Sequence, residues 1–333
     1  MMNDQQRSEQ TNAPRRRGRG CLLWLGWFAV VTLALIVIGA VYESVAEASD
    51  ARAYPPPGQM VDIGGYRLHI NCIGTGSPTV VIEAGLGDWS TMWAGVQLEA
   101  AKTTRVCAYD LAGSGWSDVG PLPRNAVQFA KELHSLLHNA NIPGPYVLAG
   151  HSLGGFPVRV FTDMYPSEVA GVVLIESMVP EQFKQTPTEP TLQPASQSHP
   201  FTPFPLLARI GLVRLIAGPL GLIPHLPEEE QKAYLSRMAR PSYLQAYLGD
   251  ESKGMPASAA QAAAVKTFGD IPLIVLTARL DSTYPDWQAW QTHLLQLSSN
   301  SQQLYAEKSG HNIESEQPDA AVAAIVKMVN QVR

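Results

Sequence analysis

A serine flanked by glycines is the first feature of this sequence whose spacing could support chemistry. Ser152 lies in the run GHSLGG, residues 150–155, which fits the pattern G-x-S-x-G. An apolar segment, Tyr146–Ala149, precedes the run and a helical pattern follows it, so the sequence predicts a sharp strand-to-helix turn that exposes the hydroxyl of Ser152. Glycines on both sides relieve the crowding in such a turn. The pattern alone is weak evidence, because a chain with 27 glycines can contain it by chance. The prediction depends on the strand before it and the helical pattern after it.

A serine hydroxyl needs a base to remove its proton and an acid to hold that base in the right tautomer. His311, in the sequence SGHN on a loop after the last predicted strand, is the predicted base. Asp281, in the sequence TARLDSTYP after the preceding predicted strand, is the predicted acid. Glu176 at the end of another strand and Asp286 are the alternative acids.

Other histidines are weaker candidates. His151 lies inside the predicted turn and cannot reach around to the adjacent serine. His134 and His138 are four residues apart on a predicted helix, where we expect them to face solvent. A metal site there would need a third ligand, so none is predicted.

The elements that must position these residues alternate between short β-branched runs and amphipathic helical patterns, which is typical of a mostly parallel sheet covered by helices. The Gly64-Gly65 pair predicts a tight hairpin, so we expect the sheet to begin antiparallel. Helices are predicted over 126–140 and 319–332. The predicted strands are 61–63, 66–72, 79–83, 105–109, 146–149, 171–176, 273–276 and 302–306.

About ninety residues between Glu176 and Ile271 do not continue this alternation. The stretch begins rich in proline and serine and then becomes helical, so it predicts a helical insertion that acts as a lid or is a simple excursion. Its apolar side chains either line an acyl pocket or pack in the core. They include Phe201, Phe204, Leu206 and Leu207.

Four motifs in chain order resemble the α/β-hydrolase fold superfamily over about 59–332. They are YDLAGSGWSD at Tyr109–Asp118, the serine turn, the strand that ends on Asp281, and SGHNIESEQPDAAVAAI around His311. More narrowly, the chain resembles bacterial membrane-anchored members. The resemblance implies an eight-stranded sheet, a Ser152, Asp281, His311 triad in that order, and a structural role for Asp110.

The resemblance also implies an oxyanion hole formed by the backbone N–H groups of Leu153 and Leu86. Ala84 stands where relatives commonly have histidine. A serine nucleophile excludes the relatives that attack with aspartate, and no metal or cofactor is implied. We therefore expect a serine hydrolase that cleaves a small-molecule ester or related acyl bond.

Other functions stay open on this fold. The same triad serves thioesterases, C–C hydrolases, acyltransferases and perhydrolases. A low-turnover ligand-binding protein and a membrane scaffold are alternatives from other classes. No obligate protein partner is evident. Cys72 and Cys107 fall on strands that are neighbours in this superfamily, so a disulfide and a pair of buried thiols are both open.

The N-terminal segment predicts a membrane anchor. Residues 21–41 carry no charge and would span about 31 Å as a helix at ~1.5 Å per residue. The basic cluster PRRRGR before them is expected to stay in the cytoplasm, which places the rest of the chain outside it. A signal peptide cleaved near Ala48, which would release a secreted enzyme, is the alternative.

The charge of the chain also differs between the N-terminal segment and the rest. The chain has a formal net charge of −5, but residues 1–42 hold five arginines against Asp4 and Glu9, so this segment is +3 and the remainder is −8. An acidic body argues against nucleic acid as a partner. The expected parts are a basic tail (1–20), a transmembrane anchor (21–42), a linker (43–58), the hydrolase core in two pieces (59–176 and 271–333) and a helical cap (177–270).

Overall fold

The computed structural model describes residues 17–183, 203–223, 228–281 and 283–333. An eight-stranded sheet forms its centre, in the order β1-β2-β4-β3-β5-β6-β7-β8. Strand β2 is antiparallel to both of its neighbours, β1 and β4, and all other neighbouring strands are parallel. All eight predicted strands are present, with the bounds β1 Gln59–Asp62, β2 Arg67–Ile73, β3 Thr79–Glu83, β4 Val106–Tyr109, β5 Tyr146–His151, β6 Val169–Ile175, β7 Leu273–Ala278 and β8 Ser301–Ala306.

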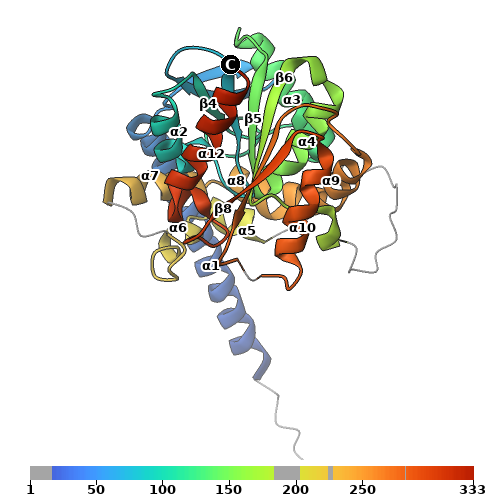
Figure 1. Ribbon diagram of the computed structural model, residues 1–333. Helices are drawn as coiled ribbons and strands as arrows, with labels where there is room; N and C mark the ends of the chain where they lie inside the picture. The colour runs from blue at the N-terminus through green and yellow to red at the C-terminus, as the bar shows by residue number, and fades with distance from the viewer. Residues whose placement is uncertain (1–16, 184–202, 224–227, 282) are drawn as a thin grey trace, which may run out of the picture.

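Helices cover both faces of the sheet (Figure 1). Two of them, α2 (Ala94–Ala100) and α12 (Pro318–Gln331), pack on one face through Val96 and Ile325. On the other face lie α3 (Ala126–Asn139) and α4 (Gly155–Met164), which bury Phe129, Leu133 and Phe161. Strands β3 to β7 are apolar in almost every position because both of their faces are buried, as expected for a parallel sheet.

The first two strands form the predicted hairpin. Asp62 fixes the turn, because its carboxylate accepts hydrogen bonds from the N–H groups of Gly64 and Gly65. On the next pair of strands Cys72 lies directly opposite Cys107, with 4.0 Å between their Cα atoms, and the two form a disulfide. Of the two states that the sequence left open, the bonded one is present.

The insertion between β6 and β7 is helical, as expected. It contains α5 (Phe204–Arg209), α6 (Leu212–Ile216), α7 (Glu228–Met238), α8 (Pro241–Gln245), a π-helical turn (Ala246–Glu251) and α9 (Ser252–Ala264). The last helix, α9, packs against α3 and α4, so it extends the helical layer of the sheet. Helices α5 to α8 share a separate apolar cluster with Trp89 of the core.

Apolar side chains on α5, at the start of the insertion, differ in how far they are buried. Leu207 is half-buried against the cluster around Trp89. Phe204 and Leu206 are 48% and 53% exposed, so the expectation that they pack in the core was wrong for these two, and the lining of an acyl pocket stays a prediction. Phe201 lies outside the described residues.

A single long helix, α1 (Arg17–Ala53), projects from the body (Figure 1). Its segment from Leu23 is long and apolar enough to cross a membrane. The helix also continues through most of the expected 43–58 linker, since its last turns pack on the cap, where Arg214 pairs with Glu43 at 2.9 Å and with Asp50 at 2.8 Å. The connection without helix or strand is therefore short.

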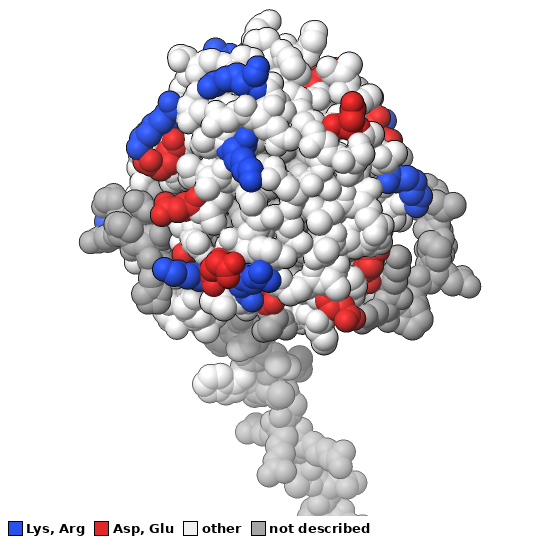
Figure 2. Space-filling view, in the orientation of Figure 1, with Lys and Arg blue, Asp and Glu red and all other residues white. Residues whose placement is uncertain are grey.

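The surface of the body carries mixed charge. On the face drawn in Figure 2, lysine and arginine side chains alternate with aspartate and glutamate across a largely uncharged surface. On this face no broad basic patch of the kind that binds nucleic acid is present among the described residues.

Candidate active site

Ser152 lies on a sharp turn between β5 and α4. Its φ is +51°, a conformation that costs free energy for a residue with a side chain. The turn is close to its neighbours, because a Cβ on Gly154 would lie 2.6 Å from the carbonyl oxygens of Glu83 and Ala84. The predicted strand, turn and helix are thus all present around the serine.

The structure brings the other two predicted residues to this turn. His311 Nε2 lies 2.9 Å from Ser152 Oγ, and His311 Nδ1 lies 3.4 Å from Asp281 Oδ2. Asp281 lies on the loop after β7 and His311 on the loop after β8. Asp286 only precedes helix α10 (Trp287–His293), and in the described structure Asp281 is the carboxylate that pairs with His311.

Asp281 is held in a fixed orientation. Its Oδ1 accepts hydrogen bonds from the N–H and hydroxyl of Thr283, at 2.9 and 2.6 Å, which leaves Oδ2 toward His311. Burial raises the pKa of Asp281, but the Thr283 hydrogen bonds and His311 outweigh it, and the pKa lies below its usual value. Asp281 is therefore an anion at neutral pH.

His311 is neutral at the same pH. Burial and the nearby His151 lower its pKa below 6.5, although Asp281 acts in the opposite direction. A neutral imidazole with Nδ1–H toward Asp281 carries a free lone pair on Nε2, and this atom faces the hydroxyl of Ser152. The pair is thus in the protonation state that a general base requires.

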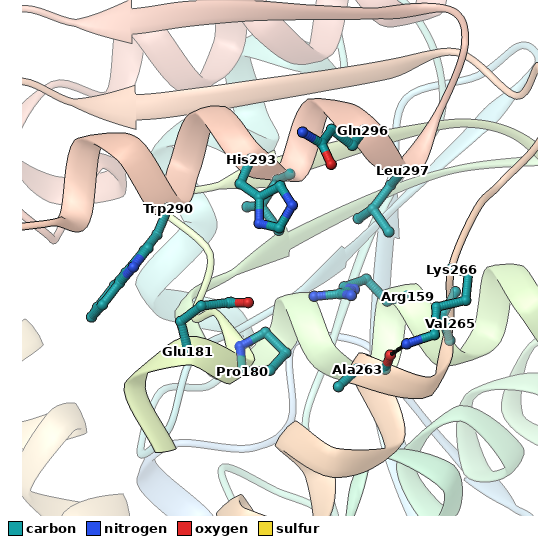
Figure 3. Close-up of a pocket in the computed structure, with 11 residues that line it drawn as sticks. Arg159, Pro180, Glu181, Ala263, Val265, Lys266, Trp290, His293, Gln296 and Leu297 are labelled. Carbon is teal, nitrogen blue, oxygen red and sulfur yellow. Dashed lines mark hydrogen bonds between the residues drawn. The ribbon is translucent and has the colours of Figure 1, made fainter. Parts of the chain in front are cut away.

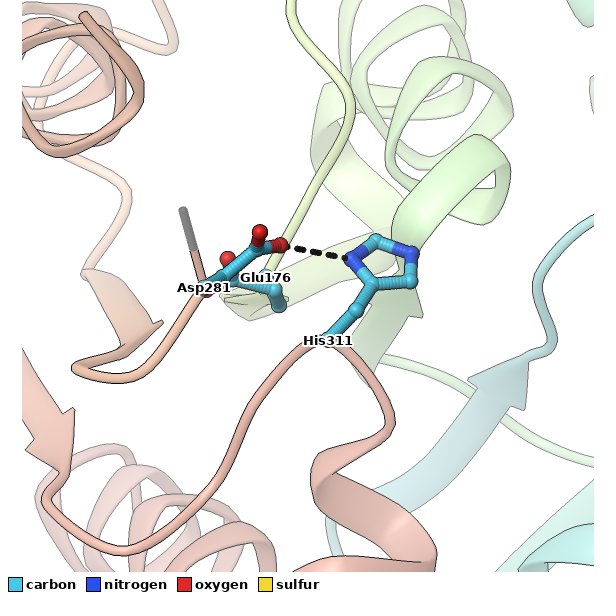
Figure 4. Close-up of side chains that lie close together, drawn as sticks. All are labelled: Glu176, Asp281 and His311. Carbon is cyan, nitrogen blue, oxygen red and sulfur yellow. Dashed lines mark ion pairs between the residues drawn. The ribbon is translucent and has the colours of Figure 1, made fainter. Parts of the chain in front are cut away.

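Glu176 lies beside this pair at the end of β6 (Figure 4). Its carboxyl group accepts hydrogen bonds from the N–H of Ala278, at 2.6 Å, and from the indole N–H of Trp287. Burial raises the pKa of Glu176 to about 8 in spite of these bonds. Glu176 therefore holds a proton at neutral pH and supports Asp281, instead of replacing it as the partner of His311.

Glu176, Asp281 and His311 are also close enough to hold a cation, since their ligand atoms lie within 4.8 Å of one another. Each of these side chains, however, already pairs with a protein group. Contacts within the protein therefore account for the closeness of these three side chains without a bound cation.

His151 has a role that sequence reasoning missed. Its Nε2–H donates a hydrogen bond to the backbone carbonyl of His311, at 2.9 Å, so the residue before Ser152 holds the loop that carries His311. Burial lowers the pKa of His151, which keeps the ring neutral. The position of His151 next to Ser152 was the only sign of this role in the sequence. The contact itself joins residues 160 positions apart, and no local pattern predicts it. His134, in turn, is part-buried and stacks on Tyr165 instead of facing solvent.

The loop expected to supply Leu86 lies directly against Ser152. A Cβ on Gly85 would be 3.2 Å from the Cβ of Ser152. The cap also holds this loop, because the hydroxyl of Tyr243 donates a hydrogen bond to the carbonyl of Gly87 at 2.8 Å. Leu153 is buried beside the serine. The two backbone groups predicted to form an oxyanion hole are thus in segments that adjoin the hydroxyl.

Asp110 is fully buried away from this cluster. Its carboxylate accepts hydrogen bonds from the N–H groups of Ser90 and Trp116 and contacts the ring of His69 at 2.9 Å. It joins strand β2, the short helical turn that begins at Ser90 and the loop at Trp116, in line with the structural role that the resemblance implied.

A separate cavity of about 310 Å³ lies between α4, α9 and α10 (Figure 3). Arg159, Lys266 and His293 are among its lining residues, and Ser152, Asp281 and His311 are not. The cavity is therefore distinct from the serine cluster.

Comparison with known proteins gives the same fold. Residues 78–202 match a family model described as alpha/beta hydrolase fold. A protein named "Probable transporter efuK" from Hormonema carpetanum is 27% identical over 313 residues, which cover 82% of this chain and 42% of that protein. The chain thus spans less than half of this relative. The uncharacterized protein YqjL of Bacillus subtilis is 25% identical over 76% of this chain and 83% of its own length.

A thermophilic esterase from Thermogutta terrifontis is similar in structure, with a TM-score of 0.60 at 23% identity over 82% of this chain and 98% of that chain.

Proposed function

We propose that this chain, which has the α/β-hydrolase fold, is a serine hydrolase that cleaves an ester or related acyl bond. The observation that carries the proposal is the 2.9 Å contact between His311 Nε2 and Ser152 Oγ, with Asp281 on the other ring nitrogen. The roles follow from the protonation states derived above. Asp281 is the anion, His311 the neutral base and Ser152 the nucleophile.

In the proposed reaction His311 Nε2 takes the hydroxyl proton as Ser152 Oγ attacks the carbonyl carbon of the substrate. The tetrahedral oxyanion accepts hydrogen bonds from the N–H groups of Leu86 and Leu153. His311 then gives its proton to the departing alkoxide, which leaves an acyl-enzyme. Water, activated by His311, attacks this ester and restores the serine.

We further propose that α1 anchors the enzyme in a membrane, with the catalytic body outside the cytoplasm. The apolar run and the basic cluster before it support this topology. The contacts of Arg214 with Glu43 and Asp50 favour a retained helix over cleavage near Ala48, because cleavage there would remove Glu43 from a buried ion pair.

The test of the catalytic proposal is ester hydrolysis by the full chain, measured with p-nitrophenyl esters of increasing acyl length. We expect Ser152→Ala to lower kcat by roughly 10⁴-fold or more, because the reaction loses its nucleophile. Ser299→Ala, an exposed serine on the same chain, is the matched control and should retain wild-type activity. Activity that survives in Ser152→Ala would overturn the assignment, and the profile of the wild type would define the acyl chain that fits.

A further inference from the structure

Exposed apolar side chains concentrate in one part of the cap. Outside α1, the described residues include eight large hydrophobic side chains that are exposed. Five of the eight fall within nineteen residues, on α5, α6 and the turn after them, and they are 48% to 62% exposed. We call this group the cap patch, and its members are Phe204, Leu206, Leu215, Leu220 and Leu222. Such clustering marks an interaction surface, whereas scattered apolar residues do not.

The cap patch is rigidly joined to α1. Gly39 of α1 lies so close to the turn between α5 and α6 that a Cβ there would collide with the carbonyl oxygen of Ile210. On the other side of this contact, a Cβ on Gly211 would lie 2.7 Å from the ring of Tyr42. The ion pairs of Arg214 with Glu43 and Asp50 fix α6 one to three turns further along the helix.

These contacts set the height of the cap relative to a membrane that α1 would span. Gly39 is two residues inside the end of the apolar run 21–41, which corresponds to about 3 Å along a helix. The turn at Ile210 and Gly211 is therefore level with the boundary between hydrocarbon and headgroups. Arg214 and its partners lie on the aqueous side of that boundary. Figure 1 shows α5 and α6 at the root of α1, on the side of the body from which this helix projects.

The charge of the segment also fits a lipid surface. Residues 203–223 contain Arg209 and Arg214 and no acidic residue. Arg214 is paired with α1, and Arg209 is exposed beside the apolar side chains. An apolar face with a cationic side chain at its edge is typical of segments that lie in the membrane interface.

We propose that the cap patch docks on the outer surface of the same bilayer that α1 spans. This inference rests on the proposed anchor and goes beyond it, because it gives the body a second attachment and a fixed orientation. Helix α8, whose Tyr243 holds the loop beside Ser152, packs against α5. Docking of the cap patch would therefore place α5 and α6 on the lipid surface and α8 between them and that loop.

The test measures the depth of single fluorescent labels in the full chain. Cys21→Ser removes the cysteine outside the disulfide, and Leu206→Cys, Leu220→Cys, Leu98→Cys or Val31→Cys then supplies one site for an environment-sensitive nitrobenzoxadiazole label. Leu98 is exposed like the cap patch and serves as the matched control, because its helix, α2, lies away from α1 (Figure 1). Each protein is reconstituted in nanodiscs of phosphatidylcholine and phosphatidylglycerol, with or without nitroxide-labelled lipids.

We expect nitroxides near the headgroups to quench the labels at positions 206 and 220 by roughly half and to leave the label at position 98 unchanged. Nitroxides deep in the acyl chains should quench the label at position 31. Quenching at 31 without quenching at 206 and 220 overturns the docking proposal and leaves the anchor intact. Labels at 206 and 220 that become shielded without lipid quenching indicate contact with a second copy, which also overturns it. A label at 31 that is not quenched overturns the anchor itself.

Discussion

The side chains of Ser152, Asp281 and His311 come from separate parts of the chain and lie together. Each has an environment suited to a different task. Thr283 keeps Asp281 ionised, burial keeps His311 neutral, and the positive φ of Ser152 presents its hydroxyl to the ring. Glu176 contributes a buried, protonated carboxyl group next to Asp281. Two carboxyl groups a few ångströms apart thus differ in charge because their surroundings differ.

The identity of the acid can be tested by substitution. Asp281→Asn should lower kcat by roughly 10⁴-fold, since the amide cannot hold the tautomer of His311 that leaves Nε2 free. Asp286→Asn, five residues away, is the control and should be close to wild type. If kcat of Asp281→Asn falls by less than roughly tenfold, Asp281 is not the acid of the triad and Glu176 takes its place as the partner of His311.

The pH dependence of kcat/KM reports on His311. The base must be neutral, and its pKa is lowered from 6.5, so activity should persist below pH 6.5 and fall as the pH drops through the lowered pKa. The measurement is kcat/KM for an uncharged ester as a function of pH. An acid limb with its midpoint above 6.5 would contradict the derived environment of His311.

Among the residues of the candidate site, those that belong to sequence motifs could be predicted. Ser152, Asp281 and His311 follow strands whose carboxyl ends share one edge of the sheet, so their meeting could be anticipated. The supporting contacts of His151 and Glu176 could not, because they join segments 160 and 102 residues apart without a local signature.

At the scale of elements, the strands were predictable because both faces of a parallel sheet are apolar and the runs are short. The full length of α1 was not. Its last turns are polar, and they contact the cap, where Glu43 pairs with Arg214, 171 residues away. The role of α9 as part of the helical layer likewise depends on packing against α3 and α4.

The disulfide between β2 and β4 gives an element-scale prediction. Replacing both Cys72 and Cys107 by alanine should lower the free energy of unfolding by about 4 kcal/mol, the chain-entropy value for a 35-residue separation. Thermal melts of the full chain in detergent measure the loss. In denatured, unreduced wild type one thiol should react, that of Cys21, and three reactive thiols would show that the bond is absent.

At the scale of the whole molecule, the net charge of −5 hides two parts with different surroundings. A basic tail and an apolar helix lead into an acidic body whose cap lies at the root of that helix. The chain therefore combines a hydrolase fold with a geometry in which the cap and the proposed membrane surface adjoin.

The orientation of the molecule in the membrane is testable with a fusion. A reporter that is active only outside the cytoplasm, attached after Arg333, should be active, because the arginines at 15–17 hold the N-terminus inside. Replacing these three arginines with glutamate should lower the reporter signal, whereas the same change at exposed lysines of the body should not. A silent fusion to the wild type would reverse the proposed topology.

The most direct test of Ser152 as nucleophile is labelling of the full chain with a fluorophosphonate probe, followed by mass spectrometry of the modified peptide. An activated serine attacks the phosphorus, so we expect a single adduct on Ser152 that is lost in Ser152→Ala and that forms much more slowly in Asp281→Asn. A folded wild-type protein that stays unlabelled, or an adduct on another residue, would contradict it.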